Sequence, residues 1–186
     1  MSLKDLTKEV HREAERTEFA KLLMSGNIDK KQYAQYLLNM LEIYSVLEYQ
    51  CARRDMFDDL PWLGRTKHIY DDLMELNIDR NELQVLQATY DYREYLVKLG
   101  DNENYQKLMA HLYVRHMGDL YGGQMISKKV PGSGKFYQFK NKDELISKIR
   151  EKLNDDLGDE AKVAFQHAIN IMRELNEWCV GQTNKV

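Results

Sequence analysis

The sequence predicts an all-α protein of about seven or eight helices, and three observations lead to this fold class. Apolar residues recur three and four positions apart through most of the chain, which is the period of an amphipathic helix. Helix-start signals, in which Ser, Asp or Asn stands three residues before Asp, Glu or Gln, precede several of these segments. The chain holds only two prolines and shows no convincing run of paired strands. The expected fold is longer and less regular than a four-helix bundle.

Length and composition narrow the class of protein. The 186 residues suffice for one domain, so residues 1–186 are expected to fold as a unit. The net charge of −3 gives no basic field for nucleic acid, and no apolar run reaches the roughly 20 residues that span a bilayer. Cys51 and Cys179 lack CxxC spacing and are expected to be buried thiols. With no signal-peptide pattern, a cytoplasmic monomer that binds neither nucleic acid nor membrane is expected.

The first predicted helix carries two stripes. Ser2 and Asp5 form a candidate capping box, and apolar residues at helical spacing then predict a helix from about Leu3 to Arg16. A second, narrower stripe holds two cations, an imidazole and a carboxylate: Lys4, Lys8, His11 and Glu15. Taken alone, the lysines favour a solvated charged face.

Five further helices follow from the same signals. The expected ranges are Asp29 to Arg54, Arg65 to Glu75, Asp79 to Gly100, Asn141 to Asn154 and Asp159 to Cys179. Gly100 is expected to close its helix as a C-terminal cap. The segment VPGSGKFYQF, residues 130–139, is the most loop-like part of the chain, and its last four residues are apolar enough for a short extended piece.

The stretch HLYVRHMGDLYGGQM, residues 111–125, lies in a helix that is expected to begin near Glu103 and contains three glycines. Each glycine inside a helix costs about 1 kcal/mol relative to alanine. Gly118 and Gly122 are four residues apart and therefore share one face, which lacks side chains. Close packing against another helix, or a break between two helices, explains this as well as a bound ligand does.

The five histidines offer few metal sites of a familiar kind. None has a glutamate three residues before it, so the Glu-x-x-His pairs of a di-iron bundle are absent, as are HExxH, P-loop and GxSxG motifs. His11 stands out because Glu15 lies one turn after it and Lys8 and Lys4 lie one and two turns before it. A neutral imidazole can bind a metal, and the lysines can meet carboxylates of a ligand.

The helix that carries His11 and the glycine-containing stretch at residues 111–125 can both be explained by one bound ligand if the two segments face each other. A helix with one imidazole flanked by cations, opposite a helix of bare backbone, would enclose a flat, apolar dianion. Haem has that shape and charge. One axial position would belong to His11, and the other would stay without a protein ligand, as oxygen chemistry requires.

TKEVHREAE at residues 7–15 and RHMGDLYGGQ at residues 115–124 together resemble the haem oxygenase family, and the order and length of the segments agree over nearly the whole chain. The resemblance implies an all-helical fold with haem between a proximal helix and a glycine-kinked distal helix. It also implies that haem b is both cofactor and substrate. The implied reaction uses O2 and electrons to give biliverdin, carbon monoxide and ferrous iron.

The resemblance also assigns roles to individual residues. His11 matches the proximal ligand of the haem iron, and Glu15 matches the acidic residue after it. Positions near the haem propionates or the pocket are matched by Lys4, Lys8, Tyr113, Arg150 and Phe165. The distal glycines over the haem are matched by Gly118 and Gly122, with Gly123 completing the motif. Asp119 matches the distal carboxylate that orders water. Arg115 and Tyr44 match two members of its hydrogen-bond network.

Five positions depart from the family pattern. Ala168 stands where an asparagine is expected, which predicts a rearranged distal water network. Ile146 stands where a second base is common, although Lys148 is close, so propionate anchoring is expected to differ. His116, Met117 and Tyr121 also differ from the commoner residues.

The expected partners follow from this reaction. Ferredoxin or a similar reductase would supply electrons, and a bilin reductase would act downstream. The chain resembles short microbial or phage members of the family, which places it in the cytoplasm, or in the host cytoplasm if phage-encoded. A non-enzymatic haem carrier or sensor is the main alternative. A purely structural helical protein would leave the His11 stripe and the glycines unexplained. A thiaminase-like relative of the same fold is a further alternative, but this sequence has no cysteine near these motifs to serve as its nucleophile.

Overall fold

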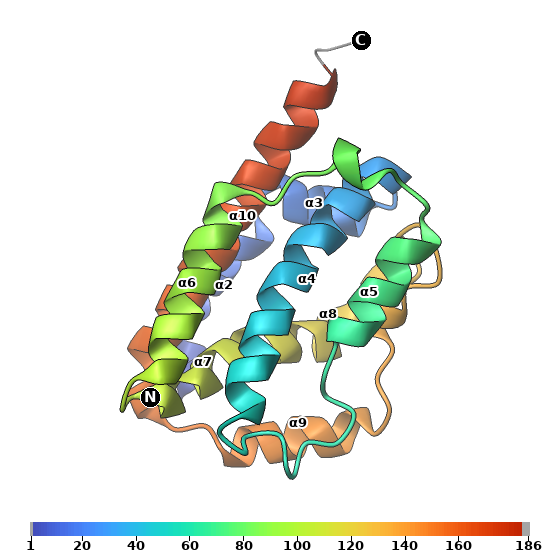
Figure 1. Ribbon diagram of the computed structural model, residues 1–186. Helices are drawn as coiled ribbons and strands as arrows, with labels where there is room; N and C mark the ends of the chain where they lie inside the picture. The colour runs from blue at the N-terminus through green and yellow to red at the C-terminus, as the bar shows by residue number, and fades with distance from the viewer. Residues whose placement is uncertain (1, 184–186) are drawn as a thin grey trace.

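The computed structural model describes residues 2–183, which form helices joined by short loops (Figure 1). In chain order the α-helices are α1 (Leu3–Leu6), α2 (Lys8–Glu15), α3 (Glu18–Ser25), α4 (Lys30–Ala52), α5 (Thr66–Glu75), α6 (Gln87–Asp101), α7 (Leu108–Leu112), α8 (Gly118–Ile126), α9 (Lys142–Glu151) and α10 (Gly158–Thr183). A π-helical segment, η3 (Tyr113–Met117), joins α7 to α8. The 3₁₀ turns are η1 (Arg80–Glu82), η2 (Tyr105–Lys107), η4 (Lys135–Tyr137) and η5 (Asp155–Leu157).

This architecture confirms the all-α prediction, because the described residues contain no strand. The expected seven or eight helices correspond to eight when α1 with α2, and α7 with α8, are taken as interrupted helices. Within residues 2–183 no helix combines the length and the apolar character needed to cross a bilayer.

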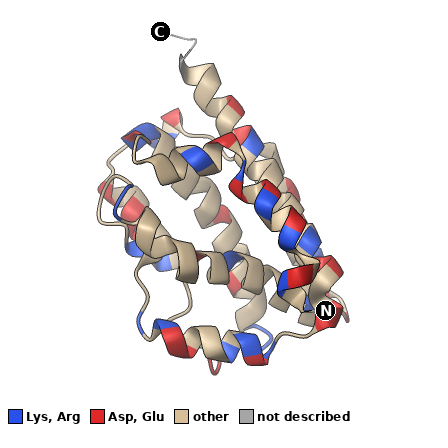
Figure 2. Cartoon of the chain, turned by 180° about the vertical axis from the view of Figure 1, so that it is seen from behind, with Lys and Arg blue, Asp and Glu red and all other residues tan. Residues whose placement is uncertain are grey.

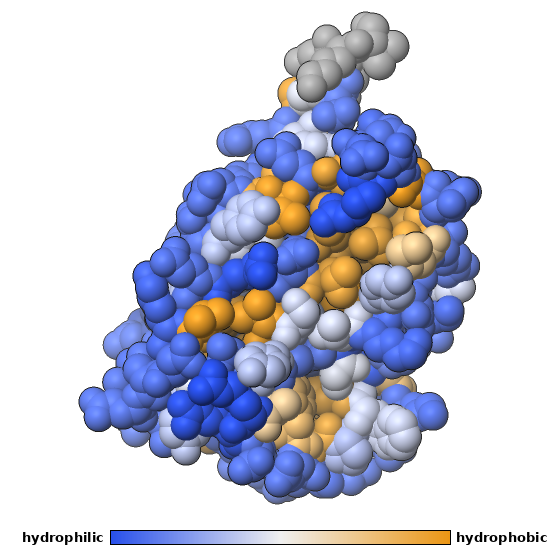
Figure 3. All heavy atoms as spheres, viewed as in Figure 1, coloured by the Kyte–Doolittle hydropathy of each residue, from blue (hydrophilic) through white to orange (hydrophobic). Residues whose placement is uncertain are grey.

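The helices form a bundle around α4, which packs between α5 and α6 (Figure 1). The long α10 packs against α2, α3 and α6, while α8 passes behind α4 and α9 runs across one end. Charged residues of both signs occur along α9, the helix at the bottom of Figure 2. On the face seen in Figure 3, hydrophobic residues gather in patches within a mostly hydrophilic surface. The arrangement leaves α2 and α8 on opposite sides of the space described below.

Several local predictions are confirmed. Both capping boxes form, Ser2 with Asp5 and Asp29 with Gln32, so the first turns of α1 and α4 satisfy their own backbone donors. Cys51 and Cys179 are buried and form no disulfide.

The first helix was expected to be continuous, and this prediction is wrong. The backbone leaves helical geometry at Thr7, whose hydroxyl donates to the Leu3 carbonyl at 2.9 Å. The helix α3 was not predicted from the sequence, although its ends carry ordinary signals: Thr17 caps it through the Ala20 amide, and Gly26 ends it with a φ of 82°.

The helix expected from Asp79 begins only at Gln87, and Gly100 is not its cap. Side chains of α4 hold the segment before α6 extended, because Gln35 bonds both backbone groups of Gln84 and Asn39 accepts from the Leu86 amide. Gly100 lies inside α6, where an added Cβ would lie 2.3 Å from Gln50 Oε1. Its lack of a side chain therefore permits close packing of α6 on α4.

The short extended piece predicted after α8 does not form. Residues 136–139 do not form an extended piece, since the Asp72 carboxylate accepts the Lys135 and Phe136 amides and stabilises the turn η4. The helix expected from Asn141 does begin there, because Asn141 is the N-cap residue of α9, although it adopts a left-handed conformation with a φ of 53° and its side chain makes no capping hydrogen bond. The helix expected near Glu103 begins instead with the turn η2.

Candidate functional site

A cavity of about 750 Å³ separates α1 and α2 from η3 and α8, with α9, η5 and α10 completing its walls. Small-molecule sites in proteins have volumes of about 300–1,000 Å³, so this space suits a ligand of considerable size. The lining residues are Ser2, Leu3, Lys4, Thr7, His11, Glu15, Tyr113, Val114, Met117, Gly118, Tyr121, Gly122, Met125, Arg150, Leu153, Asn154, Asp155 and Phe165.

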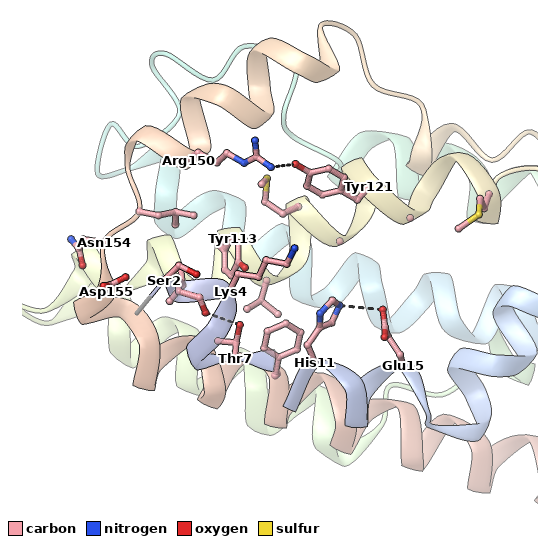
Figure 4. Close-up of a pocket in the computed structure, with 18 residues that line it drawn as sticks. Ser2, Lys4, Thr7, His11, Glu15, Tyr113, Tyr121, Arg150, Asn154 and Asp155 are labelled. Carbon is pink, nitrogen blue, oxygen red and sulfur yellow. Dashed lines mark hydrogen bonds and ion pairs between the residues drawn. The ribbon is translucent and has the colours of Figure 1, made fainter. Parts of the chain in front are cut away.

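One wall presents His11 from α2 toward α8 (Figure 4). Its side chain is 54% exposed, its Nε2 lies 3.4 Å from Glu15 Oε1, and its ring lies 5.3 Å from the Phe165 ring. When a carboxylate engages one nitrogen of an imidazole, the other nitrogen is available to a metal. His11 with Glu15 is therefore suited to be a single axial ligand.

The opposite wall is bare backbone. A Cβ added to Gly118 or to Gly122 would meet no atom within 4 Å, and both residues line the cavity. Close helix packing, one of the two alternatives left open by the sequence, does not account for these two glycines. The π-helical segment η3 immediately precedes Gly118, so the backbone hydrogen-bond pattern changes from π-helical to α-helical at Gly118.

Gly123 behaves differently from its neighbours. It lies outside the lining, and an added Cβ would lie 2.8 Å from Tyr137 Cδ1 and 2.9 Å from Tyr137 Cβ. The structure therefore does not bring Gly123 to the cavity, and its small size serves the packing of α8 on η4.

These glycines make a direct prediction for stability. Gly122→Ala is expected to raise the free energy of unfolding of the ligand-free protein by up to about 1 kcal/mol, because alanine is the better helix former and has room. Gly123→Ala is expected to lower it, since overpacking costs about 1–3 kcal/mol against the same gain. Urea unfolding of the two variants measures the difference; equal effects would contradict the assignment of Gly122 to an open wall.

Behind the glycine wall lies a buried polar group of three predicted residues. The Tyr44 hydroxyl donates to Asp119 Oδ2 at 2.5 Å, although the two residues are 75 positions apart. Burial raises the pKa of Asp119 to about 6, against the lowering effects of His116, Tyr44 and two arginines. The carboxyl can therefore change its protonation state near neutral pH.

Arg115 is buried beside this pair, with its guanidinium 5.3 Å from the centre of the Tyr92 ring. Its Nε and Nη2 have no hydrogen-bond acceptor among the described residues. Buried donors of this kind are ordinarily satisfied by ordered water or a ligand.

The predicted cations and Tyr113 divide into two groups. Lys4, Tyr113 and Arg150 line the cavity, and Arg150 Nη2 donates to the Tyr121 hydroxyl across its rim (Figure 4). Lys8 is exposed and outside the lining. Lys148 pairs with Glu144 at 2.9 Å, and Ile146 is buried in the core.

Several residues that line the cavity were not predicted as site residues from the sequence. Val114, Met117 and Met125 share the face of Gly118 and Gly122 at spacings of three and four, a signal that periodicity alone contained. Asn154 and Asp155 follow α9 and carry no such signal.

Comparisons with known proteins point to one family. The sequence profile of the family described as "Heme oxygenase" matches residues 1–174. A relative named "Heme oxygenase 2" from Macaca fascicularis is 32% identical over 94% of this chain, which spans 64% of that relative's length. "Heme oxygenase 1" from Synechocystis is 29% identical over 93% of this chain and 82% of its own.

Solved structures show the same fold. The heme oxygenase of Leptospira interrogans superposes with a TM-score of 0.80 and 27% identity, covering 94% of this chain and all of the other. Heme oxygenase-1 of Synechocystis, solved in complex with heme, gives a TM-score of 0.83 at 24% identity, covering 98% of this chain and 94% of the other. The family match over most of the sequence, together with the shared fold, shows that this chain belongs to the heme oxygenase family.

Proposed function

We propose that this chain cleaves haem oxidatively to biliverdin, carbon monoxide and ferrous iron, using O2 and electrons from an external donor. One observation carries the proposal: a single cavity has His11 on one wall and the open backbone of Gly118 and Gly122 on the other. Haem fits this arrangement. The His11 imidazole would provide one ligand of the iron, Lys4 and Arg150 would meet the carboxylates of haem, and the two glycines leave room on the side where O2 would bind.

Each residue has a physical role in this proposal. Bound haem supplies the iron that activates O2 and the porphyrin carbon that is oxidised. His11 holds the iron while Glu15 orients the imidazole through its other nitrogen. Lys4 and Arg150 orient the ligand's carboxylates, although ion pairs this exposed contribute only about 0.2–1 kcal/mol each.

The distal residues distinguish an oxygenase from a haem carrier. A carrier needs only a ligand and an apolar cavity, whereas ring oxidation also needs ordered water near the oxygen site. Asp119, held by Tyr44, and the unsatisfied donors of Arg115 can fix such water. These buried polar groups favour the oxygenase.

The decisive experiment combines the protein with hemin, O2 and a ferredoxin reducing system. We expect the Soret absorption to disappear and a green bilin to accumulate, with carbon monoxide released in equal amount. A stable haem complex that produces no bilin under any reductant would establish the carrier instead. Replacing ferredoxin by ascorbate tests whether the donor is specific.

A further inference from the structure

Tyr121 of α8 makes a contact that the proposed function does not use. Its hydroxyl accepts a hydrogen bond of 2.5 Å from Nη2 of Arg150 on α9, although the two residues are 29 positions apart. Both residues line the cavity, and Figure 4 shows their side chains pointing toward each other on the side away from His11. Tyr121 therefore links the helix of the glycine wall to a second wall of the cavity.

The ring of Tyr121 also has two cations beside it. The Arg150 guanidinium lies 5.8 Å and the Lys142 ammonium 6.0 Å from the ring centre. At such distances a cation is attracted to the face of an aromatic ring. Tyr121→Phe would keep this attraction and would remove only the hydrogen bond from Arg150.

Among the basic residues of α9, Arg150 lines the cavity. The neighbouring lysines are engaged outside it. Lys148 pairs with Glu144 at 2.9 Å. Lys152, the C-cap residue, pairs with Asp59 at 2.9 Å. The acceptor of Arg150 is a neutral hydroxyl, so the positive charge of the guanidinium remains available to a carboxylate of a ligand.

A second cation comes from the opposite side of the cavity. Lys4 belongs to α1, on the wall that also carries His11. Haem has both of its carboxylates on one edge, and a bound haem can turn about the axis through the iron and its ligand. The places at which the carboxylates are held therefore decide which part of the ring lies beside Gly118 and Gly122.

We propose that Tyr121 is a positioning residue for Arg150, and that by fixing this guanidinium it determines the orientation in which haem binds and hence the ring carbon that is cleaved. Without the hydroxyl, the long arginine side chain would occupy several rotamers, and the carboxylate that it binds would have no single position. The effect on haem rests on the proposed function, whereas the hold of Tyr121 on Arg150 does not. Tyr121 is also a position at which the sequence departs from the family pattern, so this orientation is expected to be a property of this chain.

The expected effect concerns the orientation of haem more than its affinity. An exposed pair of this kind changes an equilibrium by no more than about fivefold. The affinity of Tyr121→Phe for hemin should therefore fall by at most about fivefold. The same factor would change a ratio of, for example, about 20:1 between two haem orientations to about 4:1, which is readily measured.

The first test needs no ligand. Nitrogen-15 NMR of the arginine side chains in the ligand-free full chain, with Arg150→Lys to assign the signal, measures how fast the guanidinium hydrogens exchange with water. We expect Tyr121→Phe to release Arg150 and to speed this exchange by up to about fivefold. Equal rates in Tyr121→Phe and the wild-type protein would overturn the proposal.

Tyr70→Phe is the matched control for this substitution. Tyr70 is 51% exposed, against 50% for Tyr121, and lies on α5 outside the cavity lining. Its loss of a hydroxyl should leave the Arg150 signal and the orientation of haem unchanged. A change in Tyr70→Phe as large as that in Tyr121→Phe would overturn the proposal.

The second test measures the orientation of haem without turnover. In proton NMR of the ferric haem–cyanide complex, each orientation in the plane of the ring gives its own set of haem methyl signals. We expect one dominant set in the wild-type protein and a second set in Tyr121→Phe. Arg150→Leu should also lose the single orientation, and adding Tyr121→Phe to it should change nothing further, because the hydroxyl acts through the arginine. An unchanged pattern in Tyr121→Phe, or a further change in the double variant, would overturn the proposal.

The bilin product connects the orientation to the reaction. If haem is cleaved, Tyr121→Phe should yield a second bilin isomer in proportion to its second haem orientation, and a single unchanged isomer would overturn this last step. A failure of cleavage would contradict the proposed function instead. It would leave the arginine and cyanide measurements intact, because neither needs turnover.

Discussion

Replacing His11 by alanine is expected to abolish the histidine-ligated spectrum of the ferric haem complex and to lower turnover to background. The reason is geometric, because His11 is the imidazole that lines the cavity opposite the glycine wall. The fold should survive, since the side chain is about half exposed and alanine favours a helix by several tenths of a kcal/mol. Optical and electron paramagnetic resonance spectra of the hemin-loaded variant measure the ligand directly.

Imidazole added to this variant provides a sharper result. The truncated side chain leaves space beside Phe165, so free imidazole should restore the ligated spectrum and part of the turnover. His68→Ala, outside the cavity lining, is the matched control and should keep the parent spectrum. A His11→Ala complex that retains the parent spectrum would show that another residue holds the iron.

Local signals account for the parts of the fold that the sequence predicted well. The capping boxes at Ser2 and Asp29 depend on residues three positions apart, and helical spacing alone placed Gly118 and Gly122 on one face. Such features need no knowledge of what lies opposite.

Features that depend on distant partners could not be predicted in this way. Gly100 was expected to cap its helix and Gly123 to complete the distal glycine motif, but their roles come from Gln50 and Tyr137, which face them across the core. The hydrogen bond between His116 and Glu48 joins residues 68 positions apart, so no local pattern indicates it. The candidate site was therefore predictable where one helix face defines it and not where packing between helices does.

The open wall leads to the second large effect, expected for Gly118→Leu. A leucine side chain at this position would extend into the cavity, because nothing lies within 4 Å of a Cβ added there. The ligand-free variant should be more stable by up to about 1 kcal/mol, because leucine favours a helix over glycine. Haem affinity should fall by at least about tenfold, equivalent to about 1.4 kcal/mol, and turnover by more, since the oxygen side is filled.

Gly181→Leu separates these two effects. Gly181 also lies in a helix with nothing within 4 Å of an added Cβ, but it is outside the cavity on α10. It should gain similar stability and keep the parent affinity and turnover. Urea unfolding, hemin titration and bilin yield for both variants provide the comparison. If Gly118→Leu matched Gly181→Leu in all three measurements, the bare backbone of α8 would have no role in haem binding or turnover. The roughly 1 kcal/mol that each glycine costs would then need an explanation from the stability of the folded protein alone.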